Sequence, residues 1–248
     1  MPASARCTQT IRDLRYFSYA SGKRATRQRH LTLDDQGLEL TTHETEVVDF
    51  YNRDEVLSVY YPEVEELVKT TLGAEKVVAF DHNVRCAARK KQGDRSISGT
   101  TRFAHNDYSL RSGAQRLRDL LGCQEAAEQL RHRVMQITMW RPIRGPIQES
   151  PLAVCDARSL EAKDLVDTDL VFEERTGKIY TVAHNPNHRW IYFPLMQANE
   201  ALLMKGYDSL DVGQARFTAH TGFDDPTTPN GAPARESIEV RTFVFLPK

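Results

Sequence analysis

Short apolar runs separated by turn residues fill the second half of the chain, and this pattern predicts strands. The runs are rich in Val, Ile, Leu and aromatic residues, and Pro, Gly, Asn and Asp lie between them. The predicted strands are residues 134–140, 151–155, 178–183, 188–193, 201–205, 215–220 and 237–246. Strands of this kind are typical of a sandwich or a barrel closed by two sheets. We therefore expect a mainly β protein with flanking helices.

Two stretches ahead of these strands have helical spacing. In the first, apolar residues at steps of three or four form one stripe, Asp54 can cap the start and Gly73 can follow the end. The stripe consists of Leu57, Tyr61, Val64, Val68 and Leu72. The second stretch is residues 112–132, and Gly122 is expected to break or bend it. A short apolar strand is expected between the two helices, at residues 76–80.

The first 53 residues have weaker periodicity and are expected to form an irregular arm. Short strands are predicted at residues 15–19 and 30–33, with a turn at 34–37. A hairpin packed on the core is preferred to a lid over a substrate mouth, because hairpins are much the commoner structure. The basic run at residues 89–95 is expected to be solvated surface, and a mobile flap is its alternative.

No internal repeat, low-complexity tract or linker composition divides the chain. We therefore expect one domain over residues 1–248. Its parts would be the arm (1–53), a helical flank with the first core strands (54–132) and the remainder of the β core (133–248).

Composition excludes several classes of protein. The net charge of -1 and pI near 6.7 give no electrostatic footprint for nucleic acid. No apolar run approaches the roughly 20 residues of a membrane span, and the N-terminus does not resemble a secretion signal. The cysteines are scattered without a CxxC pair, which favours reduced thiols and a cytoplasmic setting over disulfides. The expected partner is a small-molecule substrate, and a homodimer is left open.

His105-Asn106-Asp107-Tyr108 is the stretch that points most directly to chemistry. In an extended backbone the side chains of His105 and Asp107 lie on the same face, so both can reach one cation. With a distant second His they would form the facial triad of non-haem Fe(II) oxygenases. His220 is the preferred third ligand, because it follows predicted strands and precedes a Gly/Asp/Pro loop. His188 is the alternative.

Arg235 and Ser237 lie a short way after His220, two residues apart on the last predicted strand. Their side chains would share one face and could hold a carboxylate, the guanidinium by two parallel hydrogen bonds. The distal carboxylate of 2-oxoglutarate requires such a contact. Arg241 shares the same face and could be a co-substrate anchor or a substrate contact. His-x-Asp and Arg-x-Ser are each common by chance, so the prediction rests on their order and setting.

The chain resembles the hydroxylase/desaturase family of fungal and bacterial secondary-metabolite clusters, within the Fe(II)/2-oxoglutarate-dependent oxygenase superfamily. The matching stretches are residues 80–85, 105–108, 140–142, 151–156, 188–194, 205–209, 216–226 and 235–241. The family includes proteins of the asa cluster, gibberellin-desaturase-like proteins and the cephem-methoxylation partner of cephamycin clusters. The resemblance implies a jelly-roll (double-stranded β-helix) fold, Fe(II), 2-oxoglutarate and O₂, and oxidation of a small molecule.

Several polar and aromatic residues could line the substrate pocket, although each also fits a place in the core. They are Tyr108, Trp140, Arg141, Arg189, Trp190 and Tyr192. Two other functions remain as alternatives. One is a cupin-like metal enzyme that does not use 2-oxoglutarate, which would need the three ligands but not Arg235. The other is a non-catalytic or partner-dependent binding protein of the same fold, as the cephem partner protein illustrates.

Overall fold

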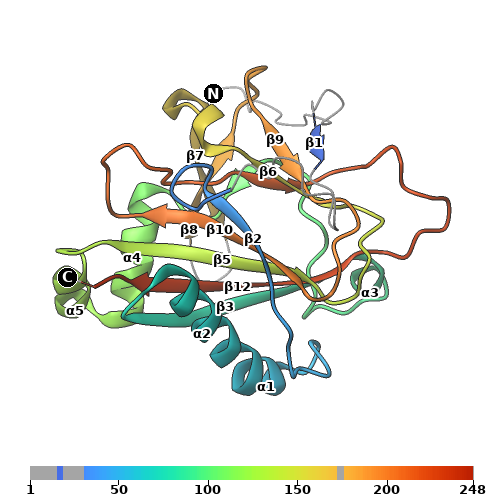
Figure 1. Cartoon of the computed structure of the whole chain (residues 1–248), viewed down its shortest axis with the longest axis horizontal. Coiled ribbons are helices and arrows are strands. Elements are labelled where there is room, and N and C mark those ends of the chain that lie inside the picture. Colours follow the sequence, from blue (N-terminus) through green and yellow to red (C-terminus); the bar gives the residue numbers. More distant parts are fainter. Residues whose placement is uncertain (1–15, 19–30, 172–175, 248) are drawn as a thin grey trace.

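Two β-sheets packed face to face form the core of the protein (Figure 1). The structure is a computed structural model, and it describes residues 16–18, 31–171 and 176–247. One sheet has seven strands in the order β1-β9-β6-β11-β4-β8-β7, and the other has five in the order β2-β10-β5-β12-β3. All described strand pairs are antiparallel except β1 with β9, which is parallel. The predicted jelly-roll class is confirmed.

The strands of the seven-stranded sheet are short apart from one hairpin. They are β1 (Tyr16–Ser18), β4 (His105–Asn106), β6 (Leu152–Cys155), β7 (Leu165–Val171), β8 (Thr176–Val182), β9 (Trp190–Tyr192) and β11 (His220–Gly222). The five-stranded sheet holds β2 (Leu38–Thr42), β3 (Lys76–Cys86), β5 (Val134–Pro142), β10 (Glu200–Asp208) and β12 (Glu236–Phe245). This second sheet has the longer strands, namely β3, β5, β10 and β12.

The outer face of the five-stranded sheet packs on a helical segment, seen below β3 and β12 in Figure 1. The segment runs through α1 (Arg53–Glu55), the π-helix η1 (Val56–Tyr60) and α2 (Tyr61–Leu72). The side chain of Asn52 caps it, and Gly73 ends it with a φ of 60°. The predicted helix and its glycine stop are confirmed, but the cap lies two residues before Asp54.

The inner face of the same sheet packs on the seven-stranded sheet. Trp140, Leu202 and Met204 meet Val154 and Ile191 in a buried apolar cluster between the two sheets. At one end, α4 (Leu110–Leu121) and α5 (Cys123–Gln129) cover β12 through a further buried cluster. Gly122 separates these helices with a φ of 81°, as the sequence predicted. Three short helices complete the elements: α3 (Ala87–Lys91), η2 (Ala157–Ser159) and η3 (Ala162–Asp164).

Several predicted boundaries were wrong for physical reasons. The strand expected at residues 76–80 continues to Cys86. Its polar second half is stabilised by ion pairs with β12, which join Asp81 to Arg241 and Arg85 to Glu239. The strand expected at 215–220 begins only at His220, and β7 was missed because polar residues interrupt it at this edge of the sheet.

The arm does not form the expected hairpin in its described part. Residues 31–32 are not in a strand, β2 pairs with β10, and β1 pairs with β9. The predicted strand residues 15, 19 and 30 lie outside the described residues. The basic run begins in α3, where Arg89 stacks on Tyr51 at 3.5 Å from the ring centroid. Among the described residues, no helix is long and apolar enough to cross a membrane. Cys86, Cys123 and Cys155 are free thiols.

Candidate metal and co-substrate site

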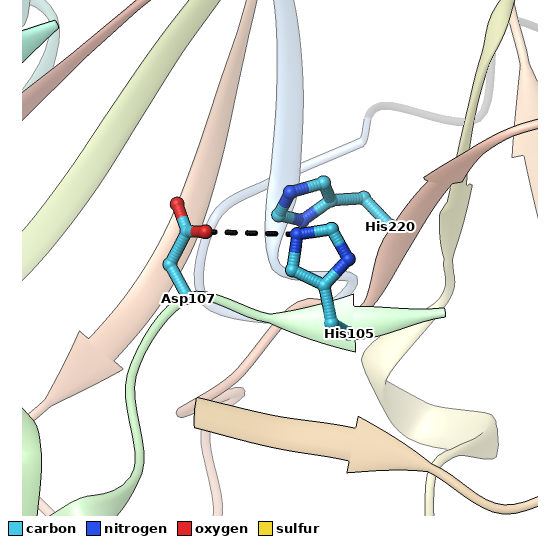
Figure 2. Close-up of side chains that lie close together, drawn as sticks. All are labelled: His105, Asp107 and His220. Atoms are coloured by element: carbon cyan, nitrogen blue, oxygen red, sulfur yellow. Dashed lines mark ion pairs between the residues drawn. The ribbon is translucent and has the colours of Figure 1, made fainter. Parts of the chain in front are cut away.

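His105, Asp107 and His220 converge between the two sheets (Figure 2). His105 in β4 and His220 in β11 are directly opposite each other in antiparallel pairing, and their ring centroids are 4.5 Å apart. Asp107 follows the end of β4, and its Oδ1 lies 3.7 Å from Nε2 of His105. The candidate ligand atoms of the three residues all lie within 4.8 Å of one another. One small cation could therefore contact all three.

Backbone carbonyls fix both imidazole rings. Nδ1 of His105 lies 3.0 Å from the carbonyl oxygen of Phe103, and Nδ1 of His220 lies 3.3 Å from that of Thr218. A carbonyl can only accept, so each Nδ1 donates and each Nε2 keeps its lone pair. Such outer contacts are typical of metal-binding histidines. Burial, and then the neighbouring His220, lower the pKa of His105 to about 4, so its ring is neutral at pH 7.

Asp107 is held ionised and oriented by Arg241. Nε of Arg241 donates to Oδ2 of Asp107 at 2.9 Å, which leaves Oδ1 toward the histidines. Burial alone would raise the pKa of Asp107, but Arg241 and then His220 hold it well below its usual range. Two neutral imidazoles and one carboxylate are the donor set that suits Fe(II). The residues present therefore fit a non-haem iron centre.

Arg235 and Ser237 lie beside this cluster with unsatisfied buried groups. Nη1 of Arg235 donates to the Ser150 carbonyl, but its Nε and the hydroxyl of Ser237 have no partner. Arg235 is 3% exposed, Ser237 is fully buried, and no carboxylate among the described residues pairs with the guanidinium. Burial, and then Arg85, lower the pKa of Arg235 to about 10, so it remains a cation at pH 7. A buried cation without an anion is costly, which points to an anionic ligand.

A small void joins Arg235 to the two histidines. It is lined by Arg85, Thr101, His105, Trp140, Leu152, His220, Thr221, Gly222, Arg235 and Glu239. Trp140, which was expected to touch substrate, instead closes the Arg235 end of this void, with the guanidinium 5.6 Å from its ring centroid.

Glu239 and Arg85 were not among the site residues predicted from the sequence. Glu239 is 4% exposed and accepts from Arg85 at 2.9 Å and from Arg241 at 2.7 Å. Arg85 also donates to the Gly99 carbonyl and the Thr101 hydroxyl, which ties β3 to the loop beside the void. The signal for Glu239 was available, because residues 235, 237, 239 and 241 share one face of β12.

A larger cleft of about 1000 Å³ opens on the other side of the triad. His105, Asp107 and Arg241 lie at its inner end, and α4 and β8 form its walls. Tyr108 also lines it, and its contact with a substrate stays a prediction. A cleft of this volume suits a small organic molecule.

The other predicted pocket residues lie away from both cavities. Arg141 contacts His43 and Phe50 on the outer face of the five-stranded sheet. Arg189 pairs with Asp156 at 3.0 Å, and Tyr192 packs edge-on against Phe223. Trp190 is buried in the same region as Tyr192. None of these four residues lines the void or the cleft, so we do not assign them as substrate contacts.

The alternative third ligand, His188, is also elsewhere. Its Nε2 lies 3.0 Å from Oδ2 of Asp164 in a buried pair, and Asn185 contacts the same carboxylate. The structure brings His220, not His188, to the His105–Asp107 pair.

Comparisons with known proteins agree with this geometry. Residues 22–245 match the family described as "Oxidoreductase/YMDC permease-like domain". The chain is 33% identical over 231 residues to the α-ketoglutarate-dependent dioxygenase phiK of a fungal species, covering 89% of this chain and 81% of the relative. It is 34% identical to the hydroxylase/desaturase efuI of Hormonema carpetanum, covering 86% and 78% of the two chains.

A solved structure is also similar. The iron- and α-ketoglutarate-dependent endoperoxidase NvfI superposes with a TM-score of 0.81 at 27% identity, over 88% of this chain and 82% of that one. Together with the sequence matches, this shows that the chain belongs to the family of Fe(II)/2-oxoglutarate-dependent dioxygenases and hydroxylase/desaturases of fungal secondary metabolism.

Proposed function

We propose that this protein oxidises a small molecule with Fe(II) held by His105, Asp107 and His220, and with 2-oxoglutarate held by Arg235 and Ser237. The observation that carries the proposal is a pair of buried, unpartnered groups placed beside a His-Asp-His cluster. Arg235, whose Nε has no partner, lines the void that His105 and His220 also line, and the unpartnered Ser237 hydroxyl belongs to the residue two positions further along the chain. A dicarboxylate could meet the metal with one end and satisfy both groups with the other.

His105, Asp107 and His220 would hold the iron, which when bound would supply O₂ chemistry. The residues of the chain supply orientation and shelter. The carbonyls of Phe103 and Thr218 hold the Nε2 atoms toward the metal, and Arg241 holds the carboxylate of Asp107. Trp140 and Leu152 line the void between the sheets and limit the entry of water.

We assign Arg241 to Asp107 and not to the co-substrate. Its three donor nitrogens contact Asp107, Asp81 and Glu239 at 2.9, 3.0 and 2.7 Å. A guanidinium engaged by three carboxylates has little left for a further anion. Arg235, without any carboxylate, is the better anchor.

An anaerobic titration tests the proposal directly. Addition of 2-oxoglutarate to the Fe(II)-loaded protein should produce a visible charge-transfer band. Arg235→Ala should weaken 2-oxoglutarate binding by about 10- to 100-fold and Ser237→Ala by less, because charge-assisted hydrogen bonds are the stronger ones. A cupin-like enzyme that ignores 2-oxoglutarate would give no band, and that result would refute the proposal.

Turnover separates the enzyme from a binding protein. Uncoupled succinate formation, measured with Fe(II), ascorbate and a panel of small molecules, should occur in the wild-type protein. His105→Ala and Asp107→Ala should abolish it while the fold is retained. If the protein's biological activity persisted in both variants, the non-catalytic alternative would hold instead.

A further inference from the structure

We infer that the substrate of this oxygenase is an apolar molecule bearing an anionic group, and that Arg111 and Arg118 of α4 bind that group. The inference rests on the proposed function, because it takes the cleft beside the triad as the substrate site. It adds the charge of the substrate and the residues that recognise it.

The cleft is cationic although the chain is nearly neutral. The net charge of the whole protein is -1, yet six basic side chains and only two acidic ones line this cavity. The basic residues are Arg85, Arg111, Arg116, Arg118, Lys178 and Arg241, and the acidic ones are Asp107 and Asp119. The lining of this cavity is therefore net positive, whereas the rest of the chain is net negative.

Most of these cations already have partners. Arg85 pairs with Glu239, Arg241 with Asp107, and Lys178 with Asp169. Arg116 lies over the Phe80 ring, with its guanidinium carbon 5.1 Å from the centroid. The inner, metal-proximal end of the cleft is thus electrically balanced.

Arg111 and Arg118 differ from the others. Both are exposed, and neither makes an ion pair with a carboxylate anywhere in the described part of the chain. They are seven residues apart on α4, so they share one helical face, with Ala114 and Gln115 between them on the cleft wall. Two unpaired guanidinium groups along one wall suit a carboxylate, sulfonate or similar anion.

Apolar side chains also line the cleft. Phe103 and Leu110 border it and are 40% and 41% exposed. Leu170 and Ile179 add apolar surface from β7 and β8. A substrate with an apolar body could pack against these residues while its anionic group contacts α4. Anchoring at α4 would fix which C–H bond of the substrate faces the iron.

Two dyes of similar skeleton test the inference. 1-Anilinonaphthalene-8-sulfonate is an apolar anion, and N-phenyl-1-naphthylamine is its neutral counterpart. Both are titrated by fluorescence into protein loaded anaerobically with Fe(II) and 2-oxoglutarate. Arg111→Gln/Arg118→Gln should weaken binding of the sulfonate by about tenfold and leave binding of the neutral dye within about twofold, because only the charge-assisted contact is lost. Added NaCl should reproduce part of the loss, since exposed charges are screened.

Two further variants locate the effect. Arg131→Gln removes an exposed arginine outside the cleft and should change neither dye. Phe103→Ala should weaken both dyes, because both need the apolar wall. The inference is overturned if the double variant binds the sulfonate like wild type, if it loses both dyes equally, or if Phe103→Ala affects neither.

The charge-transfer band is recorded in the same samples. If the band forms but the double variant does not lose sulfonate binding selectively, only the anionic-substrate inference fails. If no band forms in wild type, the proposed function fails, and this inference with it.

Discussion

His105 and His220 face each other across the β4–β11 pair, 115 positions apart in sequence and 4.5 Å apart between ring centroids. β11 lies between β6 and β4, so strand pairing on both sides fixes the position of His220. Asp107 follows β4 immediately, so it lies close to this pair of strands. Sheet register thus sets the positions of the two histidines of the candidate metal site, and the bend after β4 adds Asp107.

The sequence left open whether His220 or His188 is the third ligand. The observed arrangement predicts different effects of substituting these two histidines. His220→Ala should abolish Fe(II) binding, because it removes one of three ligands. His188→Ala should leave Fe(II) affinity unchanged and lower thermal stability, since His188 pairs with buried Asp164. Anaerobic isothermal titration with Fe(II) and thermal unfolding measure both effects. Loss of iron binding in the His188 variant would contradict the assignment.

A second prediction concerns Arg241, which contacts Asp107 from outside the candidate metal sphere. Arg241→Gln should raise the Fe(II) dissociation constant by about 10- to 100-fold, the usual range for such outer contacts. Arg241→Lys should be intermediate, because an ammonium group cannot reach three carboxylates at once. Asp81→Asn, which removes only the outer partner, is the matched control and should bind iron nearly as wild type. Equal Fe(II) affinity in all four proteins would rule out a positioning role.

Much of the fold could be predicted from the sequence, but some strands could not. The helix ending at Gly73, the break at Gly122 and the strands around 134–140 and 237–246 follow from apolar spacing and glycine conformation. The second half of β3 could not be found in this way. Its Asp81 and Arg85 are paired with Arg241 and Glu239 across the sheet, so the strand carries charge where the apolar pattern requires Val or Ile.

The candidate site, like the fold, could be predicted only in part. His105, Asp107, Arg235 and Ser237 could be proposed from sequence because two-residue spacing in an extended backbone places side chains on one face without knowledge of the fold. The choice between His220 and His188 needed long-range pairing, which sequence spacing cannot supply. Arg141 was taken for a pocket residue beside Trp140, but neighbours on a strand point to opposite faces, and only Trp140 lies between the sheets.

A third prediction follows from the unpaired cation at residue 235. Arg235→Met should raise the melting temperature of the protein without 2-oxoglutarate, because an apolar side chain replaces a buried charge that lacks an anion. In wild type, 2-oxoglutarate at 100 times its dissociation constant should add about 2.7 kcal/mol of stability, and in the variant it should add almost none. Differential scanning fluorimetry with and without 2-oxoglutarate measures both the higher melting temperature of the ligand-free variant and the loss of its stabilisation by 2-oxoglutarate. A destabilised variant without ligand would show that Arg235 is mainly structural.

A fourth prediction concerns Asn106, the fully buried residue between His105 and Asp107. Its amide nitrogen lies 2.6 Å from the Tyr108 carbonyl oxygen and 2.8 Å from that of Gly206, and its oxygen accepts from the Thr218 backbone at 3.0 Å. Asn106→Leu should cost about 3 kcal/mol, because it leaves buried backbone groups unpaired. It should also weaken Fe(II) binding, since Thr218 orients His220. Gln124→Leu, on the exposed side of α5, is the control and should change neither quantity in urea unfolding or iron titration.

The final prediction concerns acid stability of the iron-free protein. Burial, and then His220, lower the pKa of His105 to about 4, whereas an unfolded histidine has a pKa near 6.5. Between these values the unfolded chain takes up a proton that the folded protein does not, so stability falls as pH decreases through this window. The loss due to His105 should be about 2 kcal/mol between pH 7 and pH 5. Urea unfolding with a chelator present, at both pH values, measures it. His105→Gln cannot titrate at this position, so its stability should depend less on pH by about that amount, while histidines that do not contact residue 105 contribute equally to both proteins. An identical pH dependence in variant and wild type would mean that His105 is not the neutral, buried ligand that iron requires.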